Sequence, residues 1–195
     1  YSLNPEASFS IGISIGRHQL DISLIDFKCK ILKQYSLRYD YPDVQIALKK
    51  ITQSLKKIFD YLSPDQQQRL AGIGLAQPDK ISKWGEVFGV DSNILSQWDD
   101  VNIIDEIKKL APQYDVIRMN DVYAACLSEL FLGNPNKHTN FLYIYLGTFI
   151  GGAIVLNGQL FNTDQLNTSS IGTIPIHTSS GHRQLIGVAS LNSLE

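Results

Sequence analysis

The chain has 195 residues, 44% of them hydrophobic, and its 17 basic residues nearly balance its 19 acidic residues. This composition is ordinary for a soluble globular domain, and the charge balance excludes a strongly basic chain that binds nucleic acid or a membrane surface by itself. No apolar run reaches the ~18 residues of a membrane-spanning helix and no signal peptide is visible, so we expect a cytoplasmic protein.

The ends and the cysteines of the chain give three smaller expectations. Because the first residue is Tyr1 and not a methionine, we expect a fragment of a longer polypeptide. The last dipeptide, Leu194-Glu195, is either native or a cloning scar. Cys29 and Cys126 belong to no CxxC motif, which favours two reduced, buried thiols over a disulfide.

The first part of the chain reads as strands followed by a helix. Apolar residues alternate from Ser8 to Ile25, which predicts two strands joined by a turn at Gly16-Arg17-His18. A third, more polar strand is expected over Ile31–Tyr41. After Pro42-Asp43, apolar residues fall at positions 44, 48, 51, 55, 58 and 62, which is one stripe of a helix. The lysines off this stripe are interpreted as a solvated helix face.

Two later strands end in polar residues. Leu70–Ala76 leads into Gln77-Pro78-Asp79, and Val116–Met119 leads into Asn120-Asp121. Binding loops in α/β sheets usually follow the carboxyl ends of strands. Asp121 therefore has two interpretations, either the cap of a helix predicted over Val122–Leu132 or a catalytic base at a cleft.

The residues between these two strands carry weaker patterns. Positions 80–101 read as an irregular loop that covers the sheet, with three large aromatic residues among Gly, Asp and Ser. Ile103–Ala111 reads as a second helix, and Pro112 ends it.

The segment Phe141–Gly158 holds two apolar runs around a glycine cluster. The runs are typical of strands buried on both faces, and Asn157-Gly158 predicts a type I′ turn. The cluster, Gly147 to Gly152, allows two interpretations. Its backbone N–H groups can cradle a phosphate, or the glycines serve a tight hairpin for geometry alone.

The plainest linker is Gly133–Asn136. It divides the chain into a first α/β lobe over residues 1–135 and the start of a second over residues 136–195. In each lobe an apolar strand runs into a glycine, Gly16 or Gly147, and a second strand leads back from it. This likeness suggests an internal duplication around a central cleft.

Four blocks, in this order, resemble the ROK family (repressors, unassigned frames and sugar kinases) of the actin-like ATPase superfamily. They are Phe9–Asp26, Ala71–Asp79 with AGIGLAQPD, Met119–Gly133 with MNDVYAACLSELFLG, and Phe141–Leu160. The first and last look like the family's two phosphate segments. The resemblance implies an α/β, actin-like (ribonuclease H-like) two-lobe fold whose second lobe is incomplete here. It also implies a helix-turn-helix upstream of Tyr1, as in the family's repressors.

Departures from the family pattern argue against kinase chemistry. Family kinases carry D-x-G-G-T-K in the first phosphate segment, and Ser14 stands where that carboxylate manages Mg-ATP. Phe149 replaces a glycine of the second segment. We interpret the remaining positions as vestigial phosphate segments: Ser14, Gly16, Gly147, Thr148 and Gly151.

The sugar and zinc motifs have also changed. The family's sugar-contacting E-I-G-H reads Ser170-Ile171-Gly172-Thr173, without its Glu and His. The zinc block C-x-C-G-x-x-G-C-x-E aligns with Ile186–Glu195, where Ile186, Val188 and Ser193 replace the cysteines. Zinc is therefore not expected and no metal ligand is assigned. His177 and His182 are interpreted as loop histidines.

Three site residues remain by resemblance. Asp121 would be the sugar-facing base, Asn120 a hydroxyl-binding amide and Glu195 a further sugar contact. The leading hypothesis is the effector-sensing domain of a ROK-type transcriptional regulator. It would bind a sugar or related metabolite without a cofactor, form a homodimer or higher homo-oligomer, and reach DNA through a missing N-terminal domain. The alternatives are a sugar kinase using ATP and Mg with Asp121 as general base, and an oligomerisation module that binds no small molecule.

Overall fold

The computed structural model describes residues 1–85, 90–134, 136–161, 170–179 and 181–193. The chain forms two compact units, Tyr1–Asp121 (unit 1) and Val122–Glu195 (unit 2). This boundary precedes the Gly133–Asn136 linker at which the lobes were expected to separate. The helix before that linker belongs to unit 2, because Val122 at its start packs directly against Gly151 of the second hairpin.

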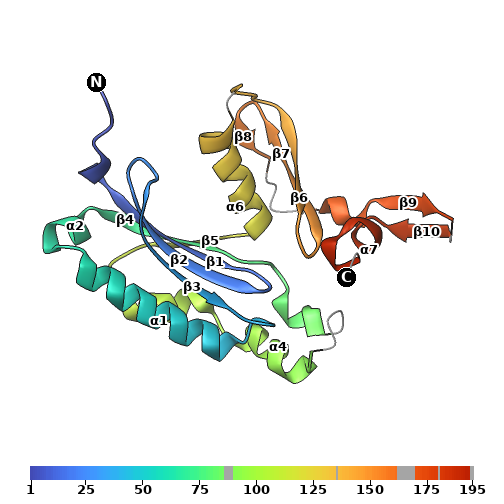
Figure 1. Cartoon of the computed structure of the whole chain (residues 1–195), viewed down its shortest axis with the longest axis horizontal. Coiled ribbons are helices and arrows are strands. Elements are labelled where there is room, and N and C mark those ends of the chain that lie inside the picture. The colour runs from blue at the N-terminus through green and yellow to red at the C-terminus, as the bar shows by residue number, and fades with distance from the viewer. Residues whose placement is uncertain (86–89, 135, 162–169, 180, 194–195) are drawn as a thin grey trace. The chain divides into compact units, whose positions relative to one another are not determined.

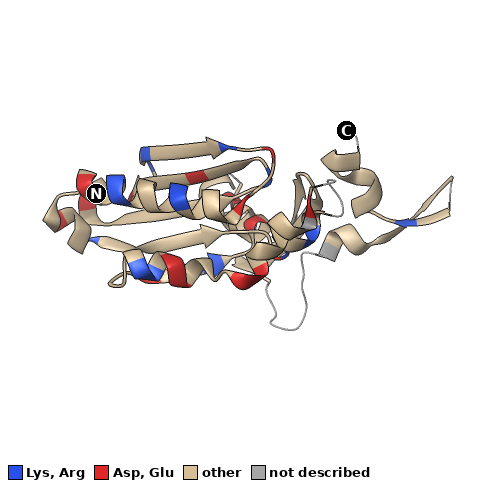
Figure 2. Cartoon of the chain, turned by 90° about the horizontal axis from the view of Figure 1, so that it is seen from below, with Lys and Arg blue, Asp and Glu red and all other residues tan. Residues whose placement is uncertain are grey.

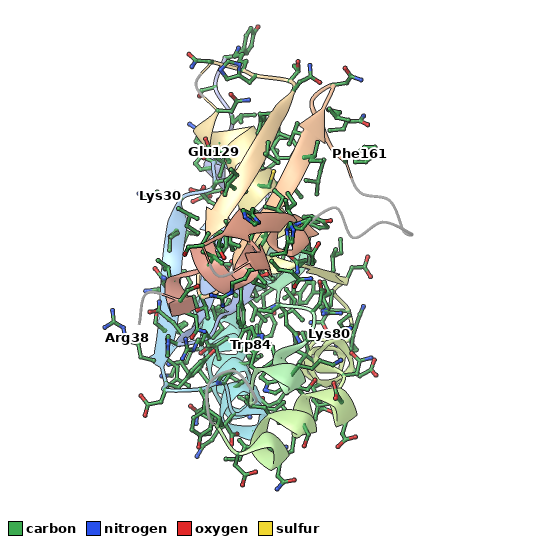
Figure 3. The ribbon with its side chains drawn as sticks, turned by 90° about the vertical axis from the view of Figure 1, so that its right-hand side faces the viewer. Lys30, Arg38, Lys80, Trp84, Glu129 and Phe161 are labelled. Atoms are coloured by element: carbon green, nitrogen blue, oxygen red, sulfur yellow. The ribbon has the colours of Figure 1, made fainter. Side chains whose placement is uncertain are left out.

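Unit 1 is built on a five-stranded mixed sheet in the order β3-β2-β1-β4-β5 (Figure 1). Its strands are β1 (Phe9–Ile15), β2 (Gln19–Asp26), β3 (Ile31–Arg38), β4 (Leu70–Ala76) and β5 (Val116–Met119). β1, β2 and β3 pair antiparallel, whereas β4 pairs parallel with both β1 and β5. The sequence predicted all five strands, although β3 ends at Arg38 instead of Tyr41 (Figure 3).

Three helices, α1 (Val44–Tyr61), α4 (Ser92–Asp100) and α5 (Ile103–Leu110), pack with this sheet. α1 begins as predicted, because the Asp43 side chain accepts hydrogen bonds from the N–H groups of Gln45 and Ile46. Its buried apolar stripe meets the isoleucines and leucines of β1 and β2 in one core. Figure 1 shows α1 running along one face of the sheet. Within the described ranges, no helix is both long and apolar enough to cross a membrane.

The prediction of an irregular loop over residues 80–101 was wrong in two places. Ile81–Trp84 forms the 3₁₀ helix η2, and α4 follows Asp91, whose side chain accepts from the N–H of Asn93. Trp98 of α4 is buried and donates its indole N–H to the carbonyl oxygen of Pro42 at 2.7 Å. α4 has too few apolar residues to show a helical periodicity in the sequence. The helix is instead stabilised by the Asp91 cap and by the contact of Trp98 with Pro42. Residues 86–89 lie outside the described residues.

The other helical segments of unit 1 are short. Ser63, directly after the C-cap of α1, caps α2 (Pro64–Gln68) in a capping box with Gln66. The 3₁₀ helix η1 (Pro5–Ala7) precedes β1. Both cysteines are free, and the expectation of two buried thiols holds for Cys126 but not for Cys29, which is exposed. Cys29 lies in a turn with φ 61°, where its side chain faces solvent.

Unit 2 contains a three-stranded antiparallel sheet, a separate hairpin and several short helical segments. The sheet is β6 (Phe141–Leu146), β7 (Ile150–Leu156) and β8 (Gln159–Leu160), and the hairpin is β9 (Pro175–Thr178) with β10 (Gly181–Gln184). Its helical segments are α6 (Asp121–Ser128), the π-helical turn η3 (Glu129–Gly133), η4 (Ser170–Thr173), α7 (Ile186–Ala189) and η5 (Leu191–Ser193). Asn157 and Gly158 have φ of 53° and 73°, which agrees with the predicted type I′ turn.

β6 does not have the two buried faces that its apolar run predicted. Leu142, Ile144 and Leu146 are 54%, 54% and 64% exposed. Among the described residues, β6 is an edge strand that pairs with β7 only. Its alternate residues Phe141, Tyr143 and Tyr145 are half-buried on the other face. A continuous apolar run therefore predicted the strand correctly but not which of its faces is covered here.

Candidate functional site

Three strand ends of unit 1 meet at one edge of its sheet. Ser14 of β1 pairs with Ala76 of β4, and Ala76 pairs with Met119 of β5. The N–H of Gln77 then donates to the carbonyl oxygen of Met119 at 3.0 Å. The parallel ladder thus brings together the predicted site residues of unit 1, which are Ser14, Gly16, Asn120 and Asp121. The carboxyl edge of parallel strands is where α/β proteins usually bind ligands.

Asp79, to which the sequence assigned no role, organises this edge. Its Oδ2 accepts a hydrogen bond from Nδ2 of Asn120 at 2.9 Å, and its Oδ1 lies 3.5 Å from a guanidinium nitrogen of Arg118. A carboxylate can only accept, so the amide nitrogen of Asn120 must face Asp79. The amide carbonyl of Asn120 therefore points to the opposite side. Asp79 fixes which half of this amide a ligand would meet.

The other two predicted sugar contacts are Asp121 and Glu195, and the structure describes only the first. Asp121 is the first residue of α6 and is half-buried, so its carboxylate stands at a helix N-terminus, where the helix dipole favours a negative charge. The residue before it, Asn120, holds the cap position of this helix, and the base interpretation of Asp121 stays a prediction. Glu195 lies outside the described residues.

The first phosphate segment is a closed turn. The N–H of Gly16 donates to the carbonyl oxygen of Gln19 at 2.9 Å, and the carbonyl oxygen of Gly16 accepts from the Tyr39 hydroxyl at 2.7 Å. Burial, and to a smaller degree the charge of Asp21, raise the pKa of this hydroxyl well above its usual value. The hydroxyl thus remains a donor at neutral pH. Both backbone groups of Gly16 are engaged within the protein.

A carboxylate does lie opposite Ser14, on the neighbouring strand. Asp21 of β2 is the antiparallel pairing partner of Ser14. Its oxygens accept from the side-chain amides of Gln19 at 2.7 Å and Gln34 at 3.3 Å, and from the hydroxyl of Ser36. A carboxylate that already accepts from three side chains is a poor substitute for one that manages a hydrated Mg²⁺. Neither Ser14 nor Asp21 fits the metal-managing role of a kinase.

The glycines of the second phosphate segment are tightly packed. A Cβ built at Gly151 would lie 2.8 Å from a methyl of Val122. One at Gly152 would lie 2.0 Å from Cδ1 of Ile171 and 2.8 Å from the carbonyl oxygen of Tyr143. Neither glycine has a positive φ. Close packing therefore accounts for both, which favours the geometric interpretation of this cluster.

The C-terminal residues bind the backbone of the same segment. The N–H groups of Leu191 and Asn192 donate to the carbonyl oxygens of Gly147 at 3.1 Å and Thr148 at 3.2 Å. The hydroxyl of Ser190 accepts from the N–H of Ile150 at 2.9 Å. The segment is thus held by its own chain at three points.

Residues 10–186 match the sequence pattern of the ROK family. The chain belongs to the ROK family. The xylose repressor of Bacillus subtilis (strain 168) is 28% identical over 163 residues, which are 81% of this chain and 40% of the repressor. The glucokinase of Thermotoga maritima is 25% identical over 154 residues, 77% of this chain and 45% of the enzyme. This ROK chain therefore spans less than half the length of these curated relatives.

Solved structures agree on the fold. A ROK family transcriptional regulator, described as a homologue of the E. coli MLC protein, superposes with a TM-score of 0.66 at 21% identity, covering 96% of this chain and 48% of the regulator. A ROK glucokinase from Streptomyces griseus, solved with glucose and AMPPNP, gives 0.63 at 18% identity over 87% of this chain and 51% of the enzyme. The predicted actin-like α/β fold is thus confirmed. Regulators and kinases share it, so the fold alone does not distinguish them.

The residues aligned with the ROK zinc block do not fit a zinc ion. Ile186 begins α7 and packs against Gly172, while Val188 and Ser193 are exposed. Hydrocarbon and hydroxyl side chains cannot replace three thiolates. In the part of the chain that the structure describes, no three His, Cys, Asp or Glu side chains group closely enough to hold a metal. The loop assignment of His177 and His182 was wrong, since they lie on β9 and β10.

A cavity of about 360 Å³ in unit 2 lies apart from the predicted residues. It is lined by Glu129, Asn134, His138, Phe141, Leu142 and Tyr143. Glu129, which Figure 3 labels, is the first residue of η3, directly after α6. Burial, and then the charges of Cys126 and Glu129, raise the pKa of the Tyr143 hydroxyl. Neither Gly147, Thr148 nor Gly151 lines this cavity, so the predicted second phosphate segment and the cavity are separate features.

Ser190→Ala should destabilise the protein by about 1–3 kcal/mol, because it leaves the N–H of Ile150 without its acceptor. Ser190 is 1% exposed, so water cannot easily replace the hydroxyl. Chemical denaturation followed by circular dichroism measures the change. Ser193→Ala, at an exposed serine of the same segment, is the matched control and should change stability by less than about 0.5 kcal/mol. Equal effects of the two substitutions would contradict the role assigned to Ser190.

Proposed function

We propose that this chain is part of the effector-sensing domain of a ROK-type transcriptional regulator that binds a sugar or a related metabolite and transfers no phosphate. The observation that carries the proposal is the state of the first phosphate segment. Ser14 has no charge to manage a metal, and the N–H and carbonyl of Gly16 are both engaged within the hairpin. Phosphoryl transfer depends on positioned donors and a metal ion, which this segment is poorly equipped to provide.

Two of the residues on the sugar side of the site are kept, although the E-I-G-H motif is not. Asn120 remains at the carboxyl edge of β5, and the carboxylate of Asp79 orients its amide. Asp121 follows at the start of α6. An oriented amide beside a carboxylate is suited to the paired donor and acceptor groups of vicinal hydroxyls. Together these residues support a ligand rich in hydroxyl groups.

The relatives supply the class of ligand to test first. Several are named xylose repressors, and another relative was solved with sucrose. These names support a pentose, a hexose or a disaccharide as the effector. A bound effector would shift the population of two conformations of the sensor, and the DNA-binding domains of such a regulator would report that shift.

The test is an assay with Mg-ATP and a sugar panel that includes xylose, glucose, N-acetylmannosamine and sucrose. We expect no sugar phosphate above the background. One sugar should raise the melting temperature, since a ligand at 100 times its dissociation constant stabilises the folded state by about 2.7 kcal/mol. Turnover at ordinary kinase rates would refute the proposal.

A sugar kinase is the second candidate, because the family resemblance assigns the general base to Asp121, at the start of α6, and glucokinases are among the relatives. In that case Asp121→Asn would abolish phosphorylation and leave sugar binding largely intact. Turnover by the wild-type chain that is lost in Asp121→Asn would favour this candidate over the sensor. A chain that neither phosphorylates nor binds any sugar would instead favour an oligomerisation module.

A further inference from the structure

The two histidines of the β9–β10 hairpin face each other across the strands. His182 pairs with His177 in an antiparallel register. The N–H of Leu185 donates to the carbonyl oxygen of Ile174 at 2.9 Å, which makes Ile174 and Leu185 a hydrogen-bonded pair. Such pairs alternate with non-hydrogen-bonded pairs along an antiparallel ladder. His177 and His182 therefore form a non-hydrogen-bonded pair, in which opposed side chains approach most closely.

The rings of this pair are spaced as two ligands of one metal ion. Their centroids are 5.0 Å apart, with an angle of 62° between the ring planes. A metal–nitrogen bond of about 2.1 Å places each ring centroid about 3.2 Å from the ion, so two rings at ~90–110° have centroids about 4.5–5.2 Å apart. The observed spacing falls within this range, and both side chains are exposed to solvent.

The surroundings of the pair are suited to a neutral two-nitrogen site. Arg183 is the one charged residue between Ser170 and Ser193, and it lies on the opposite face because neighbouring strand residues alternate. Figure 2 shows how few charged residues this hairpin carries. No carboxylate or thiolate of the hairpin competes for the ion. Water would complete the coordination.

We propose that His177 and His182 form a surface site for one divalent transition-metal ion, with Cu²⁺ bound most tightly. Imidazole pairs with open positions suit Cu²⁺ and Ni²⁺, whereas structural zinc needs four protein ligands. The bound ion would link β9 to β10 and stabilise the hairpin. The site is independent of the three positions of the lost zinc block, and of whether the chain binds a sugar.

The test uses the full chain without a histidine tag, titrated with Cu²⁺ and Ni²⁺ in a calorimeter. We expect one ion per chain, with two nitrogen ligands in the electron paramagnetic resonance spectrum of the copper form. His177→Gln and His182→Gln should each weaken binding at least about tenfold, since either removes the chelate. The double substitution should be no more than about threefold weaker than each single one.

His18→Gln and His138→Gln are the matched controls, because the chain has 4 histidines in all. Both should leave the affinity unchanged. Equal losses in all four variants, or independent and additive losses at His177 and His182, would mean adventitious binding and would overturn the proposal. Because His177 and His182 are exposed, circular dichroism should report the same fold for every variant.

Discussion

Gly152→Ala is expected to destabilise the protein by about 2–4 kcal/mol, because its new methyl group has no room. That methyl would lie 2.0 Å from Cδ1 of Ile171 and 2.8 Å from the carbonyl oxygen of Tyr143. The isoleucine side chain can turn aside, but the carbonyl belongs to the paired strand β6 and cannot move without disturbing the ladder. Chemical denaturation followed by circular dichroism measures the loss.

Gly12→Ala is the matched control, because it also places a methyl on a sheet strand. A Cβ at Gly12 meets nothing within 4 Å, and the backbone there is not in the left-handed region. We expect the free energy of unfolding to change by less than about 0.5 kcal/mol or to rise slightly, since alanine reduces the conformational freedom of the unfolded chain. Gly151→Ala should fall between the two, because its contact is a movable Val122 side chain. Equal effects at all three glycines would contradict this order.

Tryptophan fluorescence separates a local effect from a global one. Both tryptophans, Trp84 and Trp98, lie in unit 1, whereas Gly152 lies in unit 2. Gly152→Ala should therefore keep the native tryptophan spectrum in the absence of denaturant. A spectrum of unfolded type under those conditions would mean that the damage is not confined to unit 2.

The sequence predicted the parts of the fold that local patterns specify. The alternation of β1 and β2, the stripe of α1 and the Asn157-Gly158 turn each depend on residues close together in the chain. For the candidate site, the sequence predicted only the edge of the sheet on which it lies, because parallel strands bring their carboxyl ends together. From the strand ends alone, Asn120-Asp121 could be placed near Gln77-Pro78-Asp79.

The features that the sequence did not predict depend on contacts between residues far apart in the chain. α4 is held by the hydrogen bond from the Trp98 indole N–H to the carbonyl oxygen of Pro42, 56 residues away. No local pattern of apolar residues predicts this contact. The orientation of Asn120 by Asp79 joins residues 41 apart. A polar turn at the end of β4 was visible, but its partner becomes apparent only when β5 is placed beside β4. Likewise, the pairing of His177 with His182 needs the register of the hairpin.

On the proposed sugar-binding function, Asn120→Ala should weaken binding of the sugar by about 10–100-fold, and Asp79→Ala by about three- to tenfold. The smaller effect at Asp79 has two reasons. Its side chain is 48% exposed, so water screens its charge, and it acts on the ligand through Asn120. Both values are measured as dissociation constants by calorimetry, with the sugar that gives the largest thermal shift.

The double substitution decides whether Asp79 positions Asn120 or contacts the sugar itself. If it only orients the amide, Asp79→Ala should cost almost nothing once Asn120 is alanine, which appears as coupling in a double-mutant cycle. Additive losses would mean that Asp79 binds the ligand directly.

Arg118→Ala removes the longer, 3.5 Å ion pair to the same carboxylate and should change the affinity less than about threefold. A loss at Arg118 equal to that at Asp79 would instead assign the orienting role to the ion pair, because the 2.9 Å hydrogen bond to Asn120 would remain in that variant.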